Sequence, residues 1–537
     1  MSYKVGLVMD GIMQPLYVEK LIKDLIKDDF DICIIIPNAK KQIYSKSKAR
    51  DKKGIFSTFL RLYFTRLIFP LENILLKRID RHIDFQKKVN VLNITHNIIQ
   101  ITSDLNKDKI KINESEIDLM FCVGHSIDIN YIQKIISCDL LRVRYGEQKN
   151  VCNLIPGLYE VYKKKDLSTY SIELYSDVKS RVLFEGAIAT KYYILFNQAE
   201  IFELSYYYLK ITIENLRNNK ILNKYNDIIP LHSIEKPDYK FILISLSYLL
   251  VFAYRVVRKI IERINNVDLV WNVGYIKAAW NEIDDNHVVT IHNPLNHYLA
   301  DPFYCSKNDA DYCFVEDYDE ILCKGNISVY RIDEHKPIFV GTVLEDSFHF
   351  SFPYIFEYNE ELYMCPETRA INEIRLYKCI DFPLKWEYCQ TIMNGVSAVD
   401  TIIFQKDNAW WMFTNINPRG CGDHGSEMYV YKSDSPLSNN WESHAANPVV
   451  TSASFARNAG YIYGQNTIYR PSQIQGYDSY GKGFNINEIE MLTINEFHEK
   501  PVKITYPKIP GRISGMHHIS GNSKIVFFDY AIKKNKY

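Results

Sequence analysis

The hydrophobic and polar positions change their period once along the chain, near residue 266. Before that point, short apolar strands alternate with segments in which apolar residues recur every three or four positions, as in residues 3–37. Such alternation is typical of an α/β domain with a parallel sheet. From 191 to 265 only the helical period is present, and from 266 onward short strands are separated by turns. We therefore predict an α/β domain over 1–190, a helical linker over 191–265 and an all-β domain over 266–537.

The C-terminal part is built from an internal repeat. Each copy has an apolar strand, a turn and a second strand, with polar residues fifteen positions apart, as in Asp301 and Glu316 or Asp400 and Asn415. Copies that start about 50 to 60 residues apart are typical of β-propeller blades, whose small sheets bury their faces against one another. A fifth, shorter copy begins at Met516. The repeat predicts a five-bladed propeller in which the inner strands bring these polar residues to one axis.

Several stretches of the repeat also resemble a known family. The C-terminal half resembles the propeller region in the N-terminal part of plant glucosamine inositolphosphorylceramide transferases and in bacterial polysaccharide-locus proteins. It is also similar to glycosidase propellers that place three carboxylates around the axis, so the resemblance implies a glycan context. The stretches that carry it are Ala300-Asp301-Pro302-Phe303, His349-Phe350-Ser351-Phe352-Pro353, Pro366-Glu367-Thr368, Asp381-Phe382-Pro383, Val399-Asp400-Thr401, Trp410-Trp411, Arg457-Asn458-Ala459-Gly460 and Tyr469-Arg470-Pro471-Ser472-Gln473.

The axial carboxyl groups are the candidate catalytic residues. Glycosidic bonds are made and broken by a carboxylic acid that protonates the leaving oxygen and a carboxylate that acts as base or nucleophile. We assign the second role to Asp301 and the first to Glu367, while Asp400 orients the sugar or raises a neighbour's pKa, and Glu316 is a fourth candidate. Each acid has a structural alternative as a turn cap or ion-pair partner. The candidate substrate-binding residues are His349, Asn415, Arg457, Arg470, Gln473, His517 and His518.

The first 190 residues resemble the formyltransferase fold of methionyl-tRNA and sugar N-formyltransferases. That family uses an Asn-x-His motif after a strand and a later Asp. Here Arg142 and Arg144 stand at the motif's Asn and His positions, and Asp177 matches the Asp only if the register slips by one residue. Because a guanidinium stays protonated, Arg144 cannot act as the base. We expect a degenerate domain with a candidate anion site at the two arginines, or an ordinary salt bridge from them to Glu147 or Asp177.

Composition excludes some partners. The 64 Lys and Arg residues balance the 64 Asp and Glu residues, so no global charge attracts nucleic acid. Eleven scattered cysteines and an N-terminus without a signal-peptide pattern favour the cytosol. Acids and histidines on an axis also suit Ca²⁺ or Mn²⁺, but no contiguous ligand motif is present, so we predict no metal. The apolar run 241–254 is shorter than the roughly 20 residues that span a bilayer, which predicts a buried helix or one in peripheral contact with a membrane.

These features predict a cytoplasmic glycosyltransferase of bacterial surface-polysaccharide biosynthesis, meaning O-antigen or capsule. Its substrates would be an activated sugar donor and a glycan or lipid-linked acceptor, with no cofactor and no folate. One alternative is a sugar N-formyltransferase with altered catalytic residues. Another is a non-catalytic glycan-binding scaffold, which is favoured if Phe350 and Phe352 fill the axis near Asp301. A hydrolase is a further option.

Overall fold

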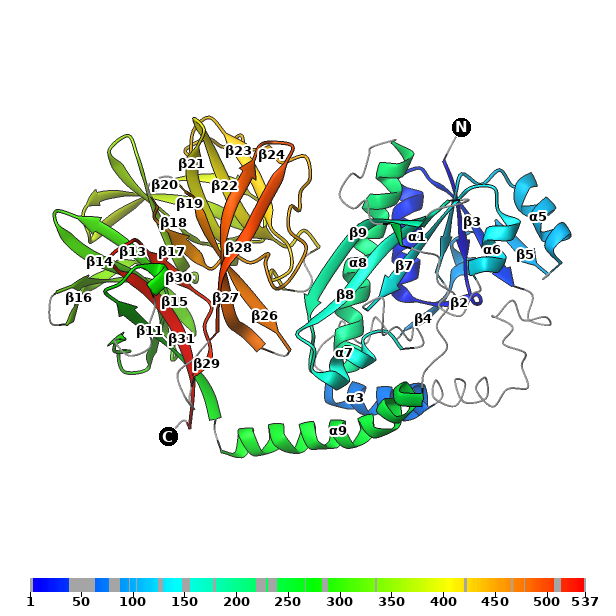
Figure 1. The fold of residues 1–537 in the computed structure, drawn as a ribbon, viewed down its shortest axis with the longest axis horizontal. Helices are drawn as coiled ribbons and strands as arrows, with labels where there is room; N and C mark the ends of the chain where they lie inside the picture. The colour runs from blue at the N-terminus through cyan, green and yellow to red at the C-terminus, as the bar shows by residue number, and fades with distance from the viewer. Residues whose placement is uncertain are drawn as a thin grey trace. The chain divides into compact units, whose positions relative to one another are not determined.

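The computed structural model divides into an N-terminal unit, Met1–Val256, and a C-terminal unit, Val257–Tyr537 (Figure 1). The sheets of both units and most of their helices are described. The described residues are 3–37, 63–76, 87–95, 97–102, 104–123, 129–146, 155–176, 180–218, 228–229, 239–265, 267–282, 288–333, 336–419, 423–464, 467–477, 479–506 and 513–535.

The N-terminal unit is built around one eight-stranded sheet with the strand order β10-β9-β8-β7-β6-β1-β3-β5. Strands β1, β3, β5, β6 and β7 are parallel, and β8, β9 and β10 continue the sheet in antiparallel pairing. A separate short ladder joins β2 to β4. The bounds are Lys4–Val8 (β1), Met13–Pro15 (β2), Asp31–Pro37 (β3), Lys88–Asn90 (β4), Ile98–Ile101 (β5), Leu119–Cys122 (β6), Asp139–Tyr145 (β7), Leu167–Tyr175 (β8), Ser180–Ala189 (β9) and Ile228–Ile229 (β10).

Helices cover both faces of this sheet. Apolar residues of α1 and α8 share a core with Leu7 of β1, whereas α5 and α6 pack with the neighbouring Val8 on the other face. Successive strand residues point to opposite faces, so a strand covered on both sides is apolar throughout. The bounds are Leu16–Lys27 (α1), Phe64–Ile68 (η1), Phe69–Leu76 (α3), Val91–Asn93 (η2), Leu105–Glu114 (α5), Ile129–Ile135 (α6) and Leu158–Lys163 (α7).

The segment 191–265, expected as a linker, contains two long helices. α8, Ile194–Arg217, buries residues such as Ile201 and Leu209 in the core of the N-terminal unit. α9, Tyr239–Ile264, begins in the N-terminal unit and ends in the C-terminal unit. Within the described part of the chain, no helix has the length and apolar content needed to cross a membrane. The formyltransferase resemblance of the N-terminal unit stays a prediction.

The C-terminal unit has the blades that the repeat predicts. Three four-stranded sheets form blades one to three, and one nine-stranded sheet contains blades four and five, joined where β25 pairs with β30. The bounds are His297–Lys307 (β13), Ala310–Asp319 (β14), Lys324–Ile332 (β15) and Pro337–Leu344 (β16) for blade one; Ser351–Tyr358 (β17), Glu361–Glu367 (β18), Glu373–Asp381 (β19) and Lys385–Asn394 (β20) for blade two; and Ala398–Lys406 (β21), Ala409–Ile416 (β22), Tyr429–Ser433 (β23) and Glu442–Ser443 (β24) for blade three.

The last blade is assembled from both ends of the unit. Blade four consists of Gly460–Ile462 (β25), Tyr469–Gly476 (β26), Ser479–Leu492 (β27) and Phe497–Thr505 (β28). Blade five combines Val267–Ile276 (β11) and Val289–Ile291 (β12) with Ile513–Gly515 (β29), Ile519–Gly521 (β30) and Val526–Asn535 (β31). The first strand, β11, pairs with the last, β31, along its whole length, from Val267 opposite Asn535 to Ile276 opposite Val526. This pairing closes the ring.

Each of the first three inner strands bulges at its start. The pairing register shifts at the same place in each blade, between Ala300 and Phe303, between Ser351 and Tyr354, and between Val399 and Ile402. The residue inside the bulge has a left-handed backbone, with φ of 48° at Asp301, 48° at Phe352 and 51° at Asp400. Bulges re-aim side chains, and Asp adopts this conformation at less cost than a bulky residue does. The bulges therefore place two acids and one phenylalanine at equivalent points of the ring.

Candidate functional site

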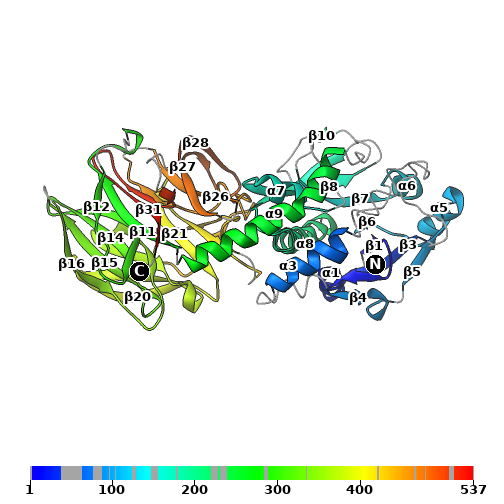
Figure 2. The same cartoon turned by 90° about the horizontal axis from the view of Figure 1, so that it is seen from below.

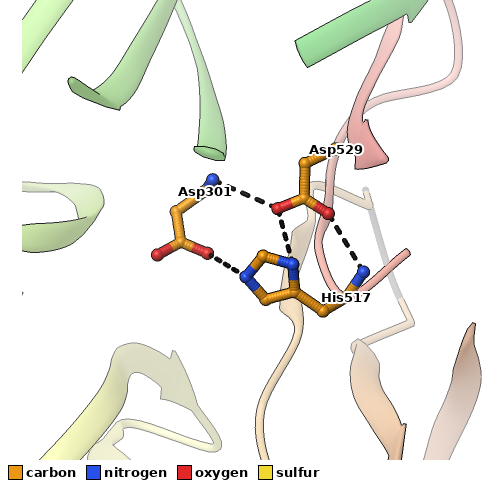
Figure 3. Close-up of side chains that lie close together, drawn as sticks. All are labelled: Asp301, His517 and Asp529. Carbon is orange, nitrogen blue, oxygen red and sulfur yellow. Dashed lines mark hydrogen bonds and ion pairs between the residues drawn. The ribbon is translucent and has the colours of Figure 1, made fainter. Parts of the chain in front are cut away.

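Asp301, His517 and Asp529 form a buried chain of ion pairs (Figure 3). Asp301 lies in the bulge of β13, His517 between β29 and β30, and Asp529 on β31. Nε2 of His517 lies 3.1 Å from Oδ1 of Asp301, and its Nδ1 lies 2.9 Å from Oδ2 of Asp529. The backbone N–H groups of Asp301 and His517 also donate to Asp529, at 3.2 and 3.0 Å. Asp529 therefore ties the first blade to the fifth.

The imidazole of His517 carries the positive charge of this group. Burial alone would lower its pKa, but the carboxylates of Asp529 and Asp301 raise the pKa to about 10. Burial alone would raise the pKa of Asp301, yet the hydrogen bonds and charges of His517 and His518 hold that pKa well below its usual range. Ligand atoms of the three side chains in Figure 3 lie within 4.8 Å of one another, a spacing also seen at metal sites. A pKa raised in this way favours an imidazolium between the two carboxylates.

Glu316 and His349 form a second pair near Asp301. Nε2 of His349 lies 3.5 Å from the Glu316 carboxyl group, and its Nδ1 accepts the backbone N–H of Gly325 at 2.8 Å. Because Nδ1 accepts, the proton of the neutral ring is on Nε2 and faces Glu316. Burial, with the charges of Asp301 and Glu367, raises the pKa of Glu316 well above its usual range, and burial lowers the pKa of His349. A Cβ at Gly325 would stand 2.7 Å from Cε1 of His349, so only glycine leaves the ring in place.

Glu367 and Asp400 interact electrostatically from blades two and three. Glu367 ends β18 and is partly exposed, whereas Asp400 in the bulge of β21 is buried. Burial and the negative charge of Asp400 raise the pKa of Glu367 to about 8. Burial also raises the pKa of Asp400, although the adjacent Arg457 opposes that change. The two shifts run in opposite directions, so the protonated form is favoured at Glu367 and the ionised form at Asp301.

Three polar residues hold Asp400. Arg457 and Asn458 lie on the segment that leads into blade four, and Gln473 lies on β26 of that blade. Nε of Arg457 donates to Oδ2 of Asp400 at 2.5 Å, and the Gln473 amide donates to the same oxygen at 3.3 Å. The amide of Asn458 donates to the backbone carbonyl of Asp400 at 2.7 Å. The Arg457 guanidinium also lies 5.1 Å from the ring centre of Tyr480. The structure thus brings Arg457 and Gln473 against a candidate catalytic carboxylate, and their roles as substrate ligands stay predictions.

Asn415 and Arg470 are fully buried and bonded to other protein groups. The amide of Asn415 donates to the backbone carbonyls of Glu427 and Ala456, at 2.7 and 2.9 Å. Nε of Arg470 donates to the carboxylate of Glu499 at 2.7 Å. These bonds tie strands of blades three and four to the segments beside them, which is a structural use for both residues.

The two candidate anion-binding arginines lie on β7 of the N-terminal unit. Arg144 forms an ion pair with the fully buried Glu173, and Arg142 stands opposite Glu173 in the ladder between β7 and β8. The partners considered from the sequence, Glu147 and Asp177, lie outside the described residues. Because Arg144 already faces a carboxylate, its charge is balanced within the protein. An anion site at this place stays a prediction.

Aromatic rings of blades one and two pack around His518. His518 is fully buried, with ring centres of Phe303 and Phe352 at 4.6 and 5.2 Å from its own. Phe350 and Phe352 are 1% and 0% exposed. Blade two therefore has an apolar side chain, that of Phe352, at the bulge position where blades one and three have Asp301 and Asp400. Glu367, in the same blade, is the acid that reaches solvent.

Three residues of this group were not predicted as site residues. Asp529 ends the fifth copy of the repeat, in the place that Glu316 has in the first, so the repeat itself held the signal. Asn458 follows Arg457 directly. Trp271, whose ring centre lies 4.2 Å from that of His517, is on β11. The repeat gives no signal for Trp271, because β11 enters the last blade from the opposite end of the unit.

The fold and the axial group together define a β-propeller that gathers a buried cluster of acids and histidines. It contains Asp301, whose pKa is held low by two histidines, and Glu367, whose pKa is raised by burial and by the charge of Asp400. The Arg457 guanidinium pairs with Asp400. Pairs of acids whose pKa values are pushed apart are the pattern of sites that transfer protons in both directions.

Comparison with known proteins places this unit beside a family of transferases. Residues 277–514 match the family described as glucosamine inositolphosphorylceramide transferase 1, N-terminal. A relative of that name from Oryza sativa subsp. japonica is 31% identical over 229 residues, which is 41% of this chain and 30% of the relative. The relative from Arabidopsis thaliana is 31% identical over 215 residues, 38% of this chain and 27% of its own length. The resemblance to the plant transferases expected from the sequence is confirmed, and the chain spans less than a third of these relatives.

Solved structures of glycoside hydrolases also match. The catalytic domain of a GH62 α-L-arabinofuranosidase from Coprinopsis cinerea matches with 11% identity and a TM-score of 0.32, covering 44% of this chain and 91% of that one. A family 117 glycoside hydrolase from Zobellia galactanivorans matches with 11% identity and a TM-score of 0.33, covering 50% and 92%. Scores this low carry no argument about chemistry.

Proposed function

We propose that the C-terminal unit is a glycosyltransferase whose active centre is the axial group of the propeller. The observation that carries this proposal is the contrast between two acids. Asp301 pairs with His517 and its pKa is lowered, whereas burial and the charge of Asp400 raise the pKa of Glu367 to about 8. The name of the plant relatives, which are glucosamine inositolphosphorylceramide transferases, supports sugar transfer as the reaction class.

The two acids take different roles in this mechanism. Oδ1 of Asp301 is occupied by His517 and His518, at 3.1 and 3.3 Å, so we assign Oδ2 to the substrate, as base or nucleophile. In a direct displacement, the acceptor hydroxyl forms the new bond to the anomeric carbon and gives its proton to Asp301. The bond from that carbon to the leaving oxygen breaks, and Glu367 gives its proton to that oxygen.

Arg457 and Asp400 support these two acids. The charge of Asp400 helps to raise the pKa of Glu367, and Arg457 and Gln473 fix where that charge lies. The Arg457 guanidinium binds Asp400 through Nε, so we assign its terminal nitrogens to bind the phosphate of an activated sugar. The acceptor that we propose is a glycan or a lipid-linked sugar of bacterial surface-polysaccharide synthesis, used on the cytoplasmic side of the membrane.

A thermal-shift screen followed by turnover tests this function. Wild type and Asp301→Asn are mixed with sugar nucleotides, lipid-phosphate sugars and folates, and release of the nucleoside diphosphate is then measured with candidate acceptors. We expect an activated sugar to raise the Tm of the wild type by about 3 °C or more. We expect Asp301→Asn to lower kcat about 100-fold or more, because the ionised acid acts in the chemical step.

Asp407→Asn is the matched control, because it is also an Asp-to-Asn substitution but lies in an exposed turn of blade three. Unchanged turnover in Asp301→Asn would contradict the assignment. Donor consumption without any acceptor would indicate a hydrolase. Stabilisation by folate alone would move the chemistry to the N-terminal unit and favour the formyltransferase alternative.

A non-catalytic glycan-binding scaffold is the second candidate, and two observations favour it. Phe352 fills part of the axis, and a hollow of about 400 Å³ lies beside β20, away from the predicted site residues. Amide side chains beside an aromatic ring suit sugar hydroxyl groups and sugar faces. The hollow is lined by Thr391, Ile392, Met393, Asn394, Asn439, Asn440 and Trp441. Glycan binding that is lost in Trp441→Ala and unaffected in Asp301→Asn, with no donor turnover, would select this candidate.

A further inference from the structure

Helix α9 has two apolar faces on opposite sides. One face carries Tyr248, Phe252 and Arg255, which are buried in the N-terminal unit. At about 100° per residue, the opposite face is centred about 180° away. That face carries an exposed apolar stripe whose members are 41% to 74% exposed and recur every three or four positions. They are Leu243, Leu246, Leu250 and Tyr254.

The buried face is fixed by specific bonds. The Tyr248 hydroxyl donates to the carboxylate of Glu72 on α3 at 2.6 Å, and that carboxylate also accepts the backbone N–H of Leu195 at the start of α8, at 2.8 Å. The Arg255 guanidinium donates to the backbone carbonyls of Tyr192 and Val161, at 2.8 and 2.6 Å. A helix held in this way keeps its outer face in one orientation, so the stripe is a fixed surface of the unit.

A second helix widens the apolar surface. α3 lies beside α9, with α7 on the other side of α9 (Figure 2), as the bond from Tyr248 to Glu72 and the 2.9 Å bond from Ser247 to Tyr162 require. η1 and α3 add exposed side chains of their own: Leu67, Ile74 and Leu75. A surface helix of a globular protein normally turns polar residues outward, and clustered exposed apolar residues mark an interaction surface.

Basic residues border this surface. Arg66 is exposed on η1, and Lys163 and Lys164 are exposed at the end of α7, directly after the Tyr162 that binds Ser247 of α9. An apolar helix face bordered by Lys and Arg is the pattern of helices that lie in the plane of a membrane, where basic groups reach the headgroups.

We propose that the exposed face of α9, together with Leu67, Ile74 and Leu75, docks the protein on an anionic lipid membrane. The stripe enters the boundary between headgroups and acyl chains, and the basic border contacts anionic headgroups. A second copy of this chain is a poorer occupant, because a two-fold interface would set the same basic border against itself. This surface is independent of the axial group, so the proposal stands whether or not the propeller transfers sugars.

Flotation of the full chain with vesicles tests the proposal. One set contains phosphatidylcholine alone, and the other contains phosphatidylcholine with phosphatidylglycerol. We expect binding to the anionic vesicles that weakens about tenfold or more in Leu246→Glu and Leu250→Glu, since each substitution places a charge in the stripe that enters the membrane. Removal of one border lysine, in Lys163→Ala or in Lys164→Ala, should weaken binding to the anionic vesicles about fivefold. Added salt should also weaken this binding.

Leu295→Glu is the matched control, because Leu295 is an exposed leucine of the C-terminal unit outside this surface. Equal loss of binding in Leu295→Glu, or no binding to either vesicle, would overturn the proposal. A wild type that is dimeric by light scattering and becomes monomeric in Leu250→Glu, without vesicle binding, would assign the face to a second copy instead. Leu250→Ser repeats the measurement with a neutral side chain, and circular dichroism checks that each variant is folded.

Discussion

The charge of the axial group depends on His517, whose imidazolium lies between Asp301 and Asp529. Its pKa of about 10 results from two buried carboxylates acting against the cost of burial. In turn this charge keeps Asp301 ionised. A buried charge of this kind is stable only while its partners remain in place.

Removal of Asp529 tests this balance. In Asp529→Asn we expect the pKa of His517 to fall toward its ordinary value of 6.5, because one of the two raising charges is lost while burial remains. The measurement is an NMR titration of histidine labelled with ¹⁵N. Asp311→Asn, elsewhere in blade one, should leave the titration unchanged. An unchanged pKa in Asp529→Asn would show that Asp529 does not hold the charge.

The protonated state of Glu367 predicts a pH dependence of activity. As the proposed acid it must carry its proton, so kcat should fall as the pH rises through about 8. Glu367→Gln cannot titrate, so it should lack this limb and reduce kcat about 100-fold or more at pH 7. The check is a pH–rate profile of both proteins on the same donor. If Glu367→Gln keeps the alkaline limb, another group gives rise to it.

At the scale of elements, Glu72 joins three helices of the N-terminal unit. It lies on α3, accepts the N–H groups of Ile194 and Leu195 at the start of α8, and accepts the hydroxyl of Tyr248 on α9. A carboxylate at a helix N-terminus also suits the helix dipole. These bonds explain why a fully buried acid is retained although burial raises its pKa.

Glu72→Ala should therefore lower the free energy of unfolding of the N-terminal unit by about 3 kcal/mol, since it leaves three buried donors without an acceptor. Urea denaturation measures this loss, and hydrogen exchange should show faster opening of α9 and of the first turn of α8. Glu114→Ala, at the exposed end of α5, should change the stability by less than about 0.5 kcal/mol. Equal effects of the two variants would refute a capping role.

At the scale of the whole C-terminal unit, ring closure depends on pH. The pKa of His517 is raised by folding, so its contribution to stability is complete below 6.5 and is lost as the pH rises through about 10. The pKa of Asp301 is lowered by folding, so its contribution is present above 3.8 and is lost as the pH falls below that value. We expect the Tm to decline at both ends of this range.

His517→Gln provides the test for the alkaline side. It should remove the decline of Tm near pH 10 and reduce stability at pH 7 by about 3 kcal/mol, because two buried carboxylates lose their cation. Differential scanning calorimetry from pH 3 to 11 measures both effects. His498→Gln, on β28, is the matched control. If the alkaline decline persists in His517→Gln, a different group produces it.

Several features were predictable because they repeat. The polar residues fifteen positions apart located Asp301, Glu316 and Asp400, since a strand-turn-strand unit fixes where equivalent residues emerge. Period alone could not locate Trp271, which joins the last blade from the other end of the unit. Nor could it assign the run 241–254 to one environment, because α9 turns one apolar face into the unit and another outward.

The sequence by itself determined the order of the parts, an α/β region followed by a propeller, and the chemical types of the axial residues. These follow from the periodicity of neighbouring positions and from the repeat, and both can be read directly along the chain. Only the tertiary structure decided in which direction the pKa of each acid is shifted, and that Arg470 pairs with Glu499 rather than with an axial acid. Burial and the charges of distant segments set those shifts, and both exist only after the ring has closed.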